Sequence, residues 1–546
     1  MKFLIFLTVL ICHAFSAEDI VLTTIERLEN NDNKSEACDN FYRHSCPHGS
    51  ELLLTNMILE VESLANGMDT SPFSNFEILT DFASLTRPVD WQEGVFELYE
   101  NFTSQKLIDI YHTRCKEGQN NKYFLLYLEK AMTRTGERYG QKYEEYCTGA
   151  SFCAHHLEFE KNCTRGATEL GKALTVLEKH FFCAHGCENK TSNLTTLVHE
   201  SQVVLRHNFQ TIMGVHLLQN NERIIKGYHK VLTLLNGMRT ILTDWIKQTK
   251  WVTNVSAESY VENIVQGLTL KLKFEDVKLD YPDTLKSAED NYVKCKKDLN
   301  TRSSHEKAVC LLYAMAKNNI KSFGKFVSYT FNPEAHNVHP FINIGLPWYL
   351  AASNSHTDAG TIGMLGFIVA HEMSHSVIED FGSNTPSHRL SFFSKKATDC
   401  IQKTYENTCY VFKEDSCRTD STQVDENGAD ILGVQLAYQY LQQLYGDRIH
   451  EIYQPLNKTY EQIFFYGTSI SFCQPGPSKT EINEEDGSMD EHSSNNIRVN
   501  VFAQHPEFRN AFNCADDSRM VKVNPEQCQI YGPNAPEVKR HRLGWF

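Results

Sequence analysis

Apolar residues recur at helical spacing through much of the first half of the chain. From about residue 51 to residue 260 they lie three and four positions apart among charged residues, most clearly in Tyr123–Met132 and Gly166–Phe182. Farther on, Phe323–Phe331 is aromatic and β-branched, and His339–Tyr349 alternates like an extended segment closed by prolines. The pattern predicts a helical lobe followed by a region that contains strands.

Two later stretches have the character of buried helices. Residues 361–378 run through almost uninterrupted apolar positions into His371, Glu372 and His375. Residues 422–440 begin with a threonine that can serve as N-cap and carry acidic residues in the first turn, as helix N-termini prefer. Polar residues inside a buried helix conflict with their surroundings and therefore require a chemical explanation.

The spacing in the first helix suits a metal site. His371 and His375 are four residues apart, so a helix places both imidazoles on one face. Two imidazole nitrogens can then reach one ion at about 2.0–2.1 Å, the usual Zn–N distance. Glu372 lies about a hundred degrees round the helix and can reach a metal-bound water without being a ligand. The pattern predicts a zinc hydrolase; the alternative is a pair of histidines that cap a core helix.

The second helix offers the missing ligand. A zinc site with two histidines needs a third protein ligand, which Glu426 can supply. Asp430 follows one turn later, where it can accept the free N–H of a ligand histidine and fix its tautomer. A Glu and Asp pair on a helix is more often exposed to solvent. Apolar residues at positions 432, 434 and 436 make the helix at least half buried, which weakens that alternative.

The N-terminus and the cysteines indicate an extracellular compartment. Met1 and Lys2 precede an apolar run, Phe3–Cys12, and small residues follow, the pattern of a secretory signal peptide cleaved after Ser16 or Ala17. Removing Cys12 from the 17 cysteines leaves an even number for disulfide pairing. Candidate N-glycosylation sequences add to this case, at Asn33, Asn101, Asn162, Asn189, Asn193, Asn254 and Asn457. We therefore expect a secreted protein.

Length and charge exclude some partners. The chain has 546 residues, more than one ordinary core holds, so two or more domains are expected. A net charge of −15 argues against nucleic acid or anionic membrane as a partner. Beyond the leader, no stretch reaches the about 18 uninterrupted apolar residues of a transmembrane helix, so we expect no membrane anchor.

Several short motifs occur together in one order. They are Cys-Asp-Asn-Phe-Tyr at residues 38–42, His371-Glu372-x-x-His375, Glu426-Asn-x-Ala-Asp430, Asp490-x-His492-Ser493, Arg498-Val499-Asn500 and Ala511-Phe512-x-Cys514. In this set and order the chain resembles the neprilysin-like zinc metallopeptidases, of the neprilysin and endothelin-converting-enzyme type. The resemblance covers residues 310–531 and 38–50, and the part between them is shorter than in typical members.

The resemblance implies a fold and its domains. We expect a mainly α fold of the α+β kind, with a thermolysin-like zinc catalytic domain and a second, helical lobe inserted between its N- and C-terminal parts. The expected boundaries are a signal peptide at 1–16, an N-terminal part tied to the catalytic domain at 17–85, a reduced helical lobe at 86–294 and the catalytic domain at 295–546.

Disulfide pairing is open from spacing alone, because Cys38 and Cys46 can bridge each other or two distant segments. The family pattern implies that the N-terminal segment is joined to the C-terminal one. The implied pairs are Cys38 with Cys514, Cys46 with Cys473, and Cys528 with one of Cys400, Cys409 or Cys417.

The resemblance also implies roles for single residues. It assigns one zinc ion per chain to His371, His375 and Glu426, and makes Glu372 the general base and later the proton donor. Asp430 resembles the partner that orients a zinc histidine. His492 resembles the donor that stabilises the oxyanion, and Arg498 the group that holds a substrate carbonyl.

Other positions concern the substrate. Phe367, Ile368 and Phe472 stand where the family forms an apolar pocket. Ser328 and Tyr329 stand where the family has an Asn-Ala edge-strand motif that grips the substrate backbone, and serine lacks the separate donor and acceptor groups of an amide. Ile378 replaces the aspartate that usually follows the second zinc histidine, which removes or shifts one outer contact.

Three hypotheses follow. The first is a secreted zinc endopeptidase that cuts short peptides on the amino side of apolar residues; its oligomeric state is open, with a monomer preferred. The alternative, motivated by Ser328 and the shortened lobe, is a zinc-containing protein that binds peptides or a partner with weak or lost catalysis. A disulfide-rich structural protein without metal would require every motif to be a coincidence.

Overall fold

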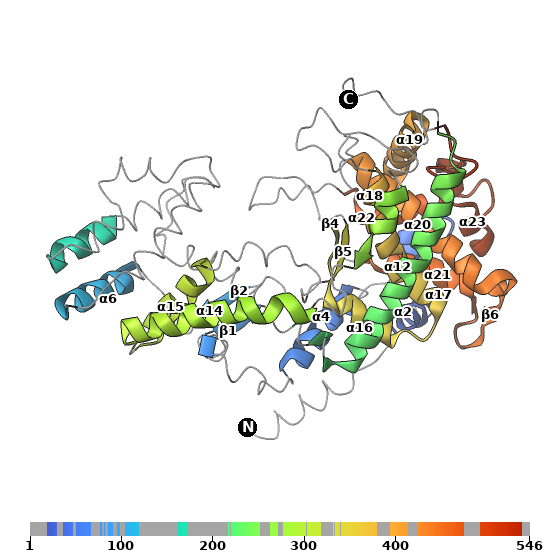
Figure 1. Ribbon diagram of the computed structural model, residues 1–546. Coiled ribbons are helices and arrows are strands. Elements are labelled where there is room, and N and C mark those ends of the chain that lie inside the picture. The colour runs from blue at the N-terminus through green and yellow to red at the C-terminus, as the bar shows by residue number, and fades with distance from the viewer. Residues whose placement is uncertain are drawn as a thin grey trace. The chain divides into compact units, whose positions relative to one another are not determined.

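The structure is a computed structural model that divides into two compact units, each described here by itself (Figure 1). Unit 1 comprises Met1–Ala65, His216–Lys271 and Thr330–Phe546, and unit 2 comprises Asn66–Val215 and Leu272–Tyr329. The structure describes residues 19–29, 36–46, 51–66, 77–78, 81, 86–90, 95–98, 104–118, 162–172, 214, 217–218, 220–251, 262–270, 277–301, 303–317, 331, 333–338, 340–378, 394–412, 423–473 and 492–537.

Unit 1 is built mainly from helices. Its N-terminal and middle helices are α2 (Ile20–Glu29), α3 (Phe41–Ser45), α4 (Glu51–Asn66), α12 (Glu222–Gln248) and α16 (Leu346–Asn354). The later ones are α17 (Asp358–Thr361), a π-helical turn (Ile362–Gly366), α18 (Phe367–Ile378), α19 (Lys395–Phe412), α20 (Gln423–Tyr445), α21 (Tyr460–Ile470), α22 (Asn495–Asn500), α23 (Pro506–Phe512) and α24 (Arg519–Val523). Short 3₁₀ turns are Gly446–His450, Gln454–Leu456 and Val501–Gln504, and its strands are β3 (Thr269–Leu270), β4 (Ala335–Val338), β5 (Phe341–Ile344), β6 (Ile452–Tyr453) and β7 (Lys458–Thr459).

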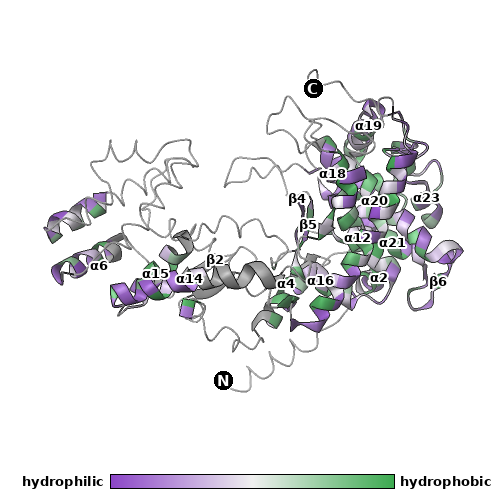
Figure 2. Ribbon diagram, in the orientation of Figure 1, coloured by the Kyte–Doolittle hydropathy of each residue, from purple (hydrophilic) through white to green (hydrophobic). Residues whose placement is uncertain are grey.

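The core of unit 1 lies between α18, α20 and α12. Both helices predicted from the apolar stretches are confirmed. α17, the π-helical turn and α18 follow one another without a break over residues 358–378, and α20 covers most of 422–440. α18 packs along α20, and α12 packs along α16. In Figure 2 green apolar stretches are concentrated on α12, α18 and α20. This packing buries α18 along its whole length, including its polar residues.

A small sheet lies beside α18. Its strand order is β3–β5–β4, with β4 antiparallel and β3 parallel to β5. The prediction that His339–Tyr349 is extended is therefore only partly correct. β5 is the central strand, and the chain then enters α16, where Pro347 suits the first turn of a helix. Among the described strands, β3 and β4 lie at the two edges of this sheet.

Within the described residues, three disulfides tie distant parts of unit 1 together. Cys38 is bonded to Cys514 and Cys46 to Cys473, across 476 and 427 residues. Cys400 is bonded to Cys528. The implied pairs are confirmed, and Cys400 is the partner of Cys528 among the three candidates. These bonds join the N-terminal segment to the C-terminal part of one unit.

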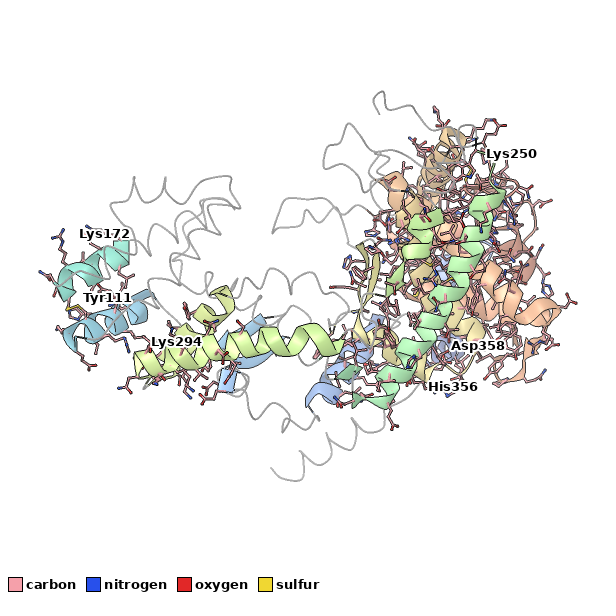
Figure 3. The ribbon with its side chains drawn as sticks, in the orientation of Figure 1. Tyr111, Lys172, Lys250, Lys294, His356 and Asp358 are labelled. Atoms are coloured by element: carbon pink, nitrogen blue, oxygen red, sulfur yellow. A yellow bond between two sulfur atoms is a disulfide. The ribbon has the colours of Figure 1, made fainter. Side chains whose placement is uncertain are left out.

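Unit 2 contains β1 (Thr86–Asp90), β2 (Val95–Leu98), α6 (Ser104–Lys116), α14 (Val277–Leu299), α15 (Ser304–Lys317) and helical residues 163–172. Figure 3 shows Tyr111 and Lys172 on the two short helices, which Cys115 and Cys163 join by a disulfide. A second disulfide, Cys295–Cys310, joins α14 to α15. β1 and β2 pair as an antiparallel hairpin, so the helical prediction is wrong there; Pro88 cannot continue a helix.

The division into units differs from the predicted boundaries. The lobe expected at 86–294 loses residues 216–271 to unit 1, and residues 295–329, expected in the catalytic domain, lie in unit 2. The reason is α12, whose buried face, including Val231, Leu235 and Met238, packs on α16 and α20. Its periodicity predicted a buried face but could not say which unit covers it.

The mainly α prediction is confirmed, and unit 2 is inserted into the sequence of unit 1. Within the described ranges, no helix has both the length and the apolar character that crossing a bilayer requires.

Candidate metal centre

His371, Glu372 and His375 lie on α18, as their spacing predicts, and all three residues are buried. The Nε2 atoms of His371 and His375 are 3.1 Å apart, and the rings meet edge to face with their centroids 4.8 Å apart. One helix turn therefore brings two imidazole nitrogens to one buried point.

Helix α20 brings Glu426 to the same point. Its Oε2 lies 3.2 Å from Nε2 of His371 and 3.5 Å from Nε2 of His375. The two helices approach closely because position 433 is glycine, where a Cβ atom would lie 3.0 Å from the backbone nitrogen of His371. A larger residue at position 433 would separate the carboxylate from the histidines.

His492 joins this cluster from the residues that precede α22. Its Nε2 lies 3.0 Å from Oε2 of Glu426, and its side chain is 41% exposed. The ligand atoms of His371, Glu426 and His492 all lie within 4.8 Å of one another. The structure thus gathers the three predicted zinc ligands and places His492 where a fourth ligand or a hydrogen-bond donor can lie.

The hydrogen-bonding pattern fits a metal ion. Nδ1 of His371 lies 3.0 Å from Oδ1 of Asp430, so we assign the ring hydrogen to Nδ1 and a lone pair to Nε2. Nε2 then faces Oε2 of Glu426, and two acceptors repel each other unless a cation lies between them. Within the described part of the chain, this buried Oε2 receives no hydrogen bond. Two imidazoles and a carboxylate are a donor set that suits zinc.

Glu426 carries the charge that a metal ligand needs. Burial raises the pKa of Glu426, and the imidazoles of His371, His375 and His492 lower it more, so the net pKa lies well below the usual range. The side chain is therefore ionised at neutral pH, which is the form that binds a metal.

Asp430 is the centre of a buried network next to His371. Its Oδ1 accepts a hydrogen bond from Nη2 of Arg498 at 2.7 Å. Its Oδ2 accepts one from Nε of Arg498 at 2.8 Å and one from the hydroxyl of Tyr405 at 3.0 Å. Burial raises the pKa of Asp430, but the charge of Arg498 and the contact with His371 hold it below its usual range. Burial raises the pKa of Tyr405, which stays a neutral donor. Asp430 is thus a fixed anion beside His371.

Two of the three predicted pocket residues, Phe367 and Phe472, pack against each other, and the ring of Phe367 lies 6.2 Å from that of His371. The rings of Phe367 and Phe472 are 5.6 Å apart and tilted edge to face, and Phe502 lies 6.1 Å from Phe367. Ile368 is 9% exposed. The guanidinium of Arg498 lies 4.6 Å above the Phe472 ring, so the network of Asp430 borders this aromatic group.

The predicted backbone-gripping residues, Ser328 and Tyr329, lie outside the described residues. The edge strand β4 instead contacts α18 through Asn337. Its Nδ2 donates to the backbone oxygen of Glu372 and, at 2.7 Å, to Oγ of Ser376. This contact fixes an edge strand beside the helix that carries Glu372.

Some residues of the site were missed from the sequence. Tyr405 and Asn337 have no local pattern that sets them apart from other residues of a helix or strand. Asn427 and Ser493 do have a signal, because each follows a predicted site residue inside its motif. The hydroxyl of Ser493 donates to Oδ1 of Asn427 at 2.8 Å.

A buried group of two histidines and a carboxylate, with a second acid one helix turn later, is a candidate site for a metal ion. Residues 332–529 match the family model described as Peptidase family M13. The resemblance to the neprilysin-like zinc metallopeptidases is thereby confirmed.

Individual relatives extend the comparison. The chain is 27% identical to Neprilysin-21 of Caenorhabditis elegans over 207 residues, covering 35% of this chain and 25% of that protein. It is 29% identical to Neprilysin-1 of Trittame loki over 174 residues, covering 29% of this chain and 24% of that protein. The matched part thus spans about a quarter of the length of these curated relatives.

A solved structure supports the fold. The chain matches the Haemonchus galactose containing glycoprotein complex with a TM-score of 0.51 and 13% sequence identity, covering 92% of this chain and 96% of that one. At this identity the likeness concerns the fold alone, and it agrees with the mainly α architecture.

Proposed function

We propose that the protein is a secreted zinc endopeptidase that hydrolyses short peptides on the amino side of apolar residues. The observation that carries the proposal is the convergence of Nε2 of His371, Nε2 of His375 and Oε2 of Glu426 within 3.5 Å of one another. The match to Peptidase family M13 over residues 332–529 supports it.

In this proposal His371, His375 and Glu426 hold one zinc ion per chain. Zinc in such a site lowers the pKa of a bound water towards about 7 and polarises the scissile carbonyl. Asp430 keeps the ring hydrogen of His371 on Nδ1, so that Nε2 presents its lone pair to the metal side.

Glu372 transfers the proton in this proposal, and His492 stabilises the negative charge that develops. Glu372 accepts a proton from the attacking water and later gives it to the leaving amine, which is general acid–base catalysis by one residue. His492 donates a hydrogen bond to the oxygen on which negative charge develops, where a fixed donor has its largest effect. Its partial exposure leaves room for a substrate oxygen beside it.

The substrate contacts are assigned to neighbouring elements. Nε and Nη2 of Arg498 are used by Asp430, so Nη1 is the group that we propose for a substrate carbonyl. Phe367, Ile368 and Phe472 form the apolar side of the site, which favours an apolar residue after the cleaved bond. An extended peptide can add to the edge of a sheet through main-chain hydrogen bonds, and β4 is an edge strand among the described residues and is tied to α18.

Secretion rests on separate observations. Disulfides such as Cys38–Cys514 and Cys46–Cys473 form in oxidising compartments. Asn457, in a candidate glycosylation sequence, is exposed in a turn with a positive φ of 49°, where an oligosaccharide transferase can reach it. Mass spectrometry of protein from a secreting host should find cleavage near residue 16 and a glycan on Asn457.

The activity is tested with a peptide mixture and a chelator. The purified protein, with its zinc content measured, is incubated with a library of short peptides in the presence and absence of 1,10-phenanthroline. We expect cleavage before apolar residues that the chelator stops and added zinc restores. One zinc per chain without chelator-sensitive cleavage would instead support the alternative, a peptide- or partner-binding protein that has lost catalysis.

A further inference from the structure

Residues 426–430 of α20 and the segment 492–498 contact each other through three pairs of residues, which follow the same order in both segments. Glu426 meets His492, Asn427 meets Ser493, and Asp430 meets Arg498. Two of these pairs contain residues with a proposed catalytic or ligand role. The pair Asn427–Ser493 contains none, yet each of its members is the chain neighbour of a proposed site residue.

Asn427 is a rigid anchor for this contact. It is 4% exposed, so the surrounding protein restricts the orientation of its amide. The next residue is Gly428, where a Cβ atom would lie 3.3 Å from Cδ1 of Ile378, so α20 lies closely against α18 at this turn. The amide oxygen that accepts the Ser493 hydroxyl is therefore fixed relative to the helix of His371.

His492 is the most exposed histidine of the cluster, with 41% of its side chain exposed. Its ring stacks on that of His371 with the centroids 6.5 Å apart, and its Nε2 contacts Oε2 of Glu426, the atom that would also bind the metal. A metal-bound carboxylate oxygen is a weaker partner for an imidazole, because its charge is shared with the cation. The adjacent Ser493 hydrogen bond, 2.8 Å long, fixes the backbone of His492 without using a ligand atom.

We propose that the hydrogen bond from Ser493 to Asn427 positions His492 for stabilisation of the developing oxyanion. The inference rests on the proposed function of His492. Because Ser493 and Asn427 follow His492 and Glu426 directly, a shift of Ser493 along α20 moves the imidazole by a similar distance. Misplacement of a catalytic group by about 1 Å can cost on the order of a hundredfold in rate.

The test compares Ser493→Ala with Ser493→Thr, which keeps the hydroxyl, in the zinc-loaded full chain. Ser494→Ala is the matched control, since the hydroxyl of that neighbour donates to Oδ1 of Asn496 and not to α20. We expect Ser493→Ala to lower kcat about ten- to a hundredfold with KM and zinc content unchanged. Ser493→Thr and Ser494→Ala should stay close to the parent.

Two further measurements distinguish a shift of His492 from a general loss of stability in Ser493→Ala. A phosphinic peptide, which carries a charged tetrahedral group, should bind Ser493→Ala more weakly by the same factor as kcat. Hydrogen–deuterium exchange in the peptide that contains residues 492–500 should speed up in Ser493→Ala and not in Ser493→Thr. The proposal is overturned if Ser493→Ala keeps the parent's kcat and exchange, or if Ser493→Thr is as impaired as Ser493→Ala.

Failure of the proposed function has a different signature. A parent protein that binds zinc but cleaves no peptide refutes the endopeptidase. The exchange measurement then still decides whether Ser493 fixes the segment: unchanged exchange in Ser493→Ala refutes the anchor, and faster exchange supports it.

Discussion

Asp81 of unit 2 and Glu426 of unit 1 are carboxylates whose side chains are equally exposed, 13% each, but their surroundings are opposite. Asp81 accepts hydrogen bonds from the hydroxyl of Tyr292 at 2.7 Å and from the ammonium groups of Lys296 at 2.6 Å and Lys307 at 2.8 Å. Glu426 faces imidazole nitrogens instead, and its Oε2 receives no hydrogen bond within the described residues.

The difference distinguishes a buried carboxylate that stabilises the fold, Asp81, from one that is suited to bind a metal ion, Glu426. Around Asp81 two cations and a phenol satisfy the carboxylate, so nothing further is needed to keep it buried. Around Glu426 the Nε2 atoms of three histidines lie within 3.5 Å of one carboxylate oxygen, a donor set that a shared metal ion would satisfy. Burial alone therefore does not identify the site; the chemical type of the partners does.

The largest expected effect is the loss of the proposed general base, Glu372. Glu372→Gln keeps the size of the side chain and removes the carboxylate that accepts a proton in the proposed mechanism. Peptide cleavage should fall about 10²- to 10⁴-fold, the usual contribution of such a group. Zinc content, measured by atomic emission, should stay at the parent's level because Glu372 is not a proposed ligand. A Glu372→Gln protein that cleaves as fast as the parent would refute the assigned mechanism.

Asp430→Asn should have the next largest effect. It removes the anion beside Nδ1 of His371 and the carboxylate that pairs with the buried Arg498. Loss of such an outer partner usually weakens metal affinity about 10- to 100-fold. Competition with a fluorescent zinc chelator measures this change. Zinc affinity equal to the parent's would mean that Asp430 does not orient His371.

These two residues also show how far the sequence could predict the site. The pairs His371–His375 and Glu426–Asp430 follow from i, i+4 spacing, because a helix turns such a pair to one face. Glu372 follows from its place directly after His371, about a hundred degrees round the helix. Neither spacing nor composition determines which separate elements meet. The approach of α20 to α18 depends on Gly433, and the attachment of β4 depends on Asn337, both of them tertiary contacts.

The domain boundaries were harder to predict for the same reason. The amphipathic pattern of Glu222–Gln248 correctly indicates a helix with a buried face. The pattern is the same whether unit 1 or unit 2 covers that face. The disulfides did not decide this, since Cys38–Cys514 and Cys46–Cys473 constrain other segments.

Tyr405→Phe should have a smaller effect on the metal centre than Asp430→Asn. The hydroxyl is one of several donors to Asp430, and both contacts from Arg498 remain. Because the hydroxyl acts on the metal only through Asp430 and His371, zinc affinity should fall by about tenfold or less, at the low end of the range for an outer partner. The same chelator competition measures it. A loss as large as that of Asp430→Asn would show that Tyr405, rather than Arg498, holds the carboxylate in place.

Asp81→Asn should leave zinc binding and cleavage unchanged and alter only the stability of unit 2. Burial raises the pKa of Asp81, but the hydrogen bonds from Lys296, Lys307 and Tyr292 lower it more, so the net pKa is below the usual value. The folded carboxylate is thus harder to protonate than the unfolded one, whose pKa is about 3.9. Its stabilisation is therefore fully present above about pH 4 and is lost as the pH falls through the folded pKa.

Hydrogen–deuterium exchange in α14 at pH 7 and below pH 4 measures this contribution. At pH 7 Asp81→Asn should destabilise unit 2 by about 1.5–3 kcal/mol, the range for hydrogen bonds to charged groups. As the pH falls through the folded pKa, the parent should lose this advantage over the variant, because its own Asp81 becomes protonated. An unchanged difference over that range would mean that the Asp81 charge does not stabilise unit 2. A fall in zinc content in Asp81→Asn would contradict the separation between a satisfied carboxylate and one that binds metal.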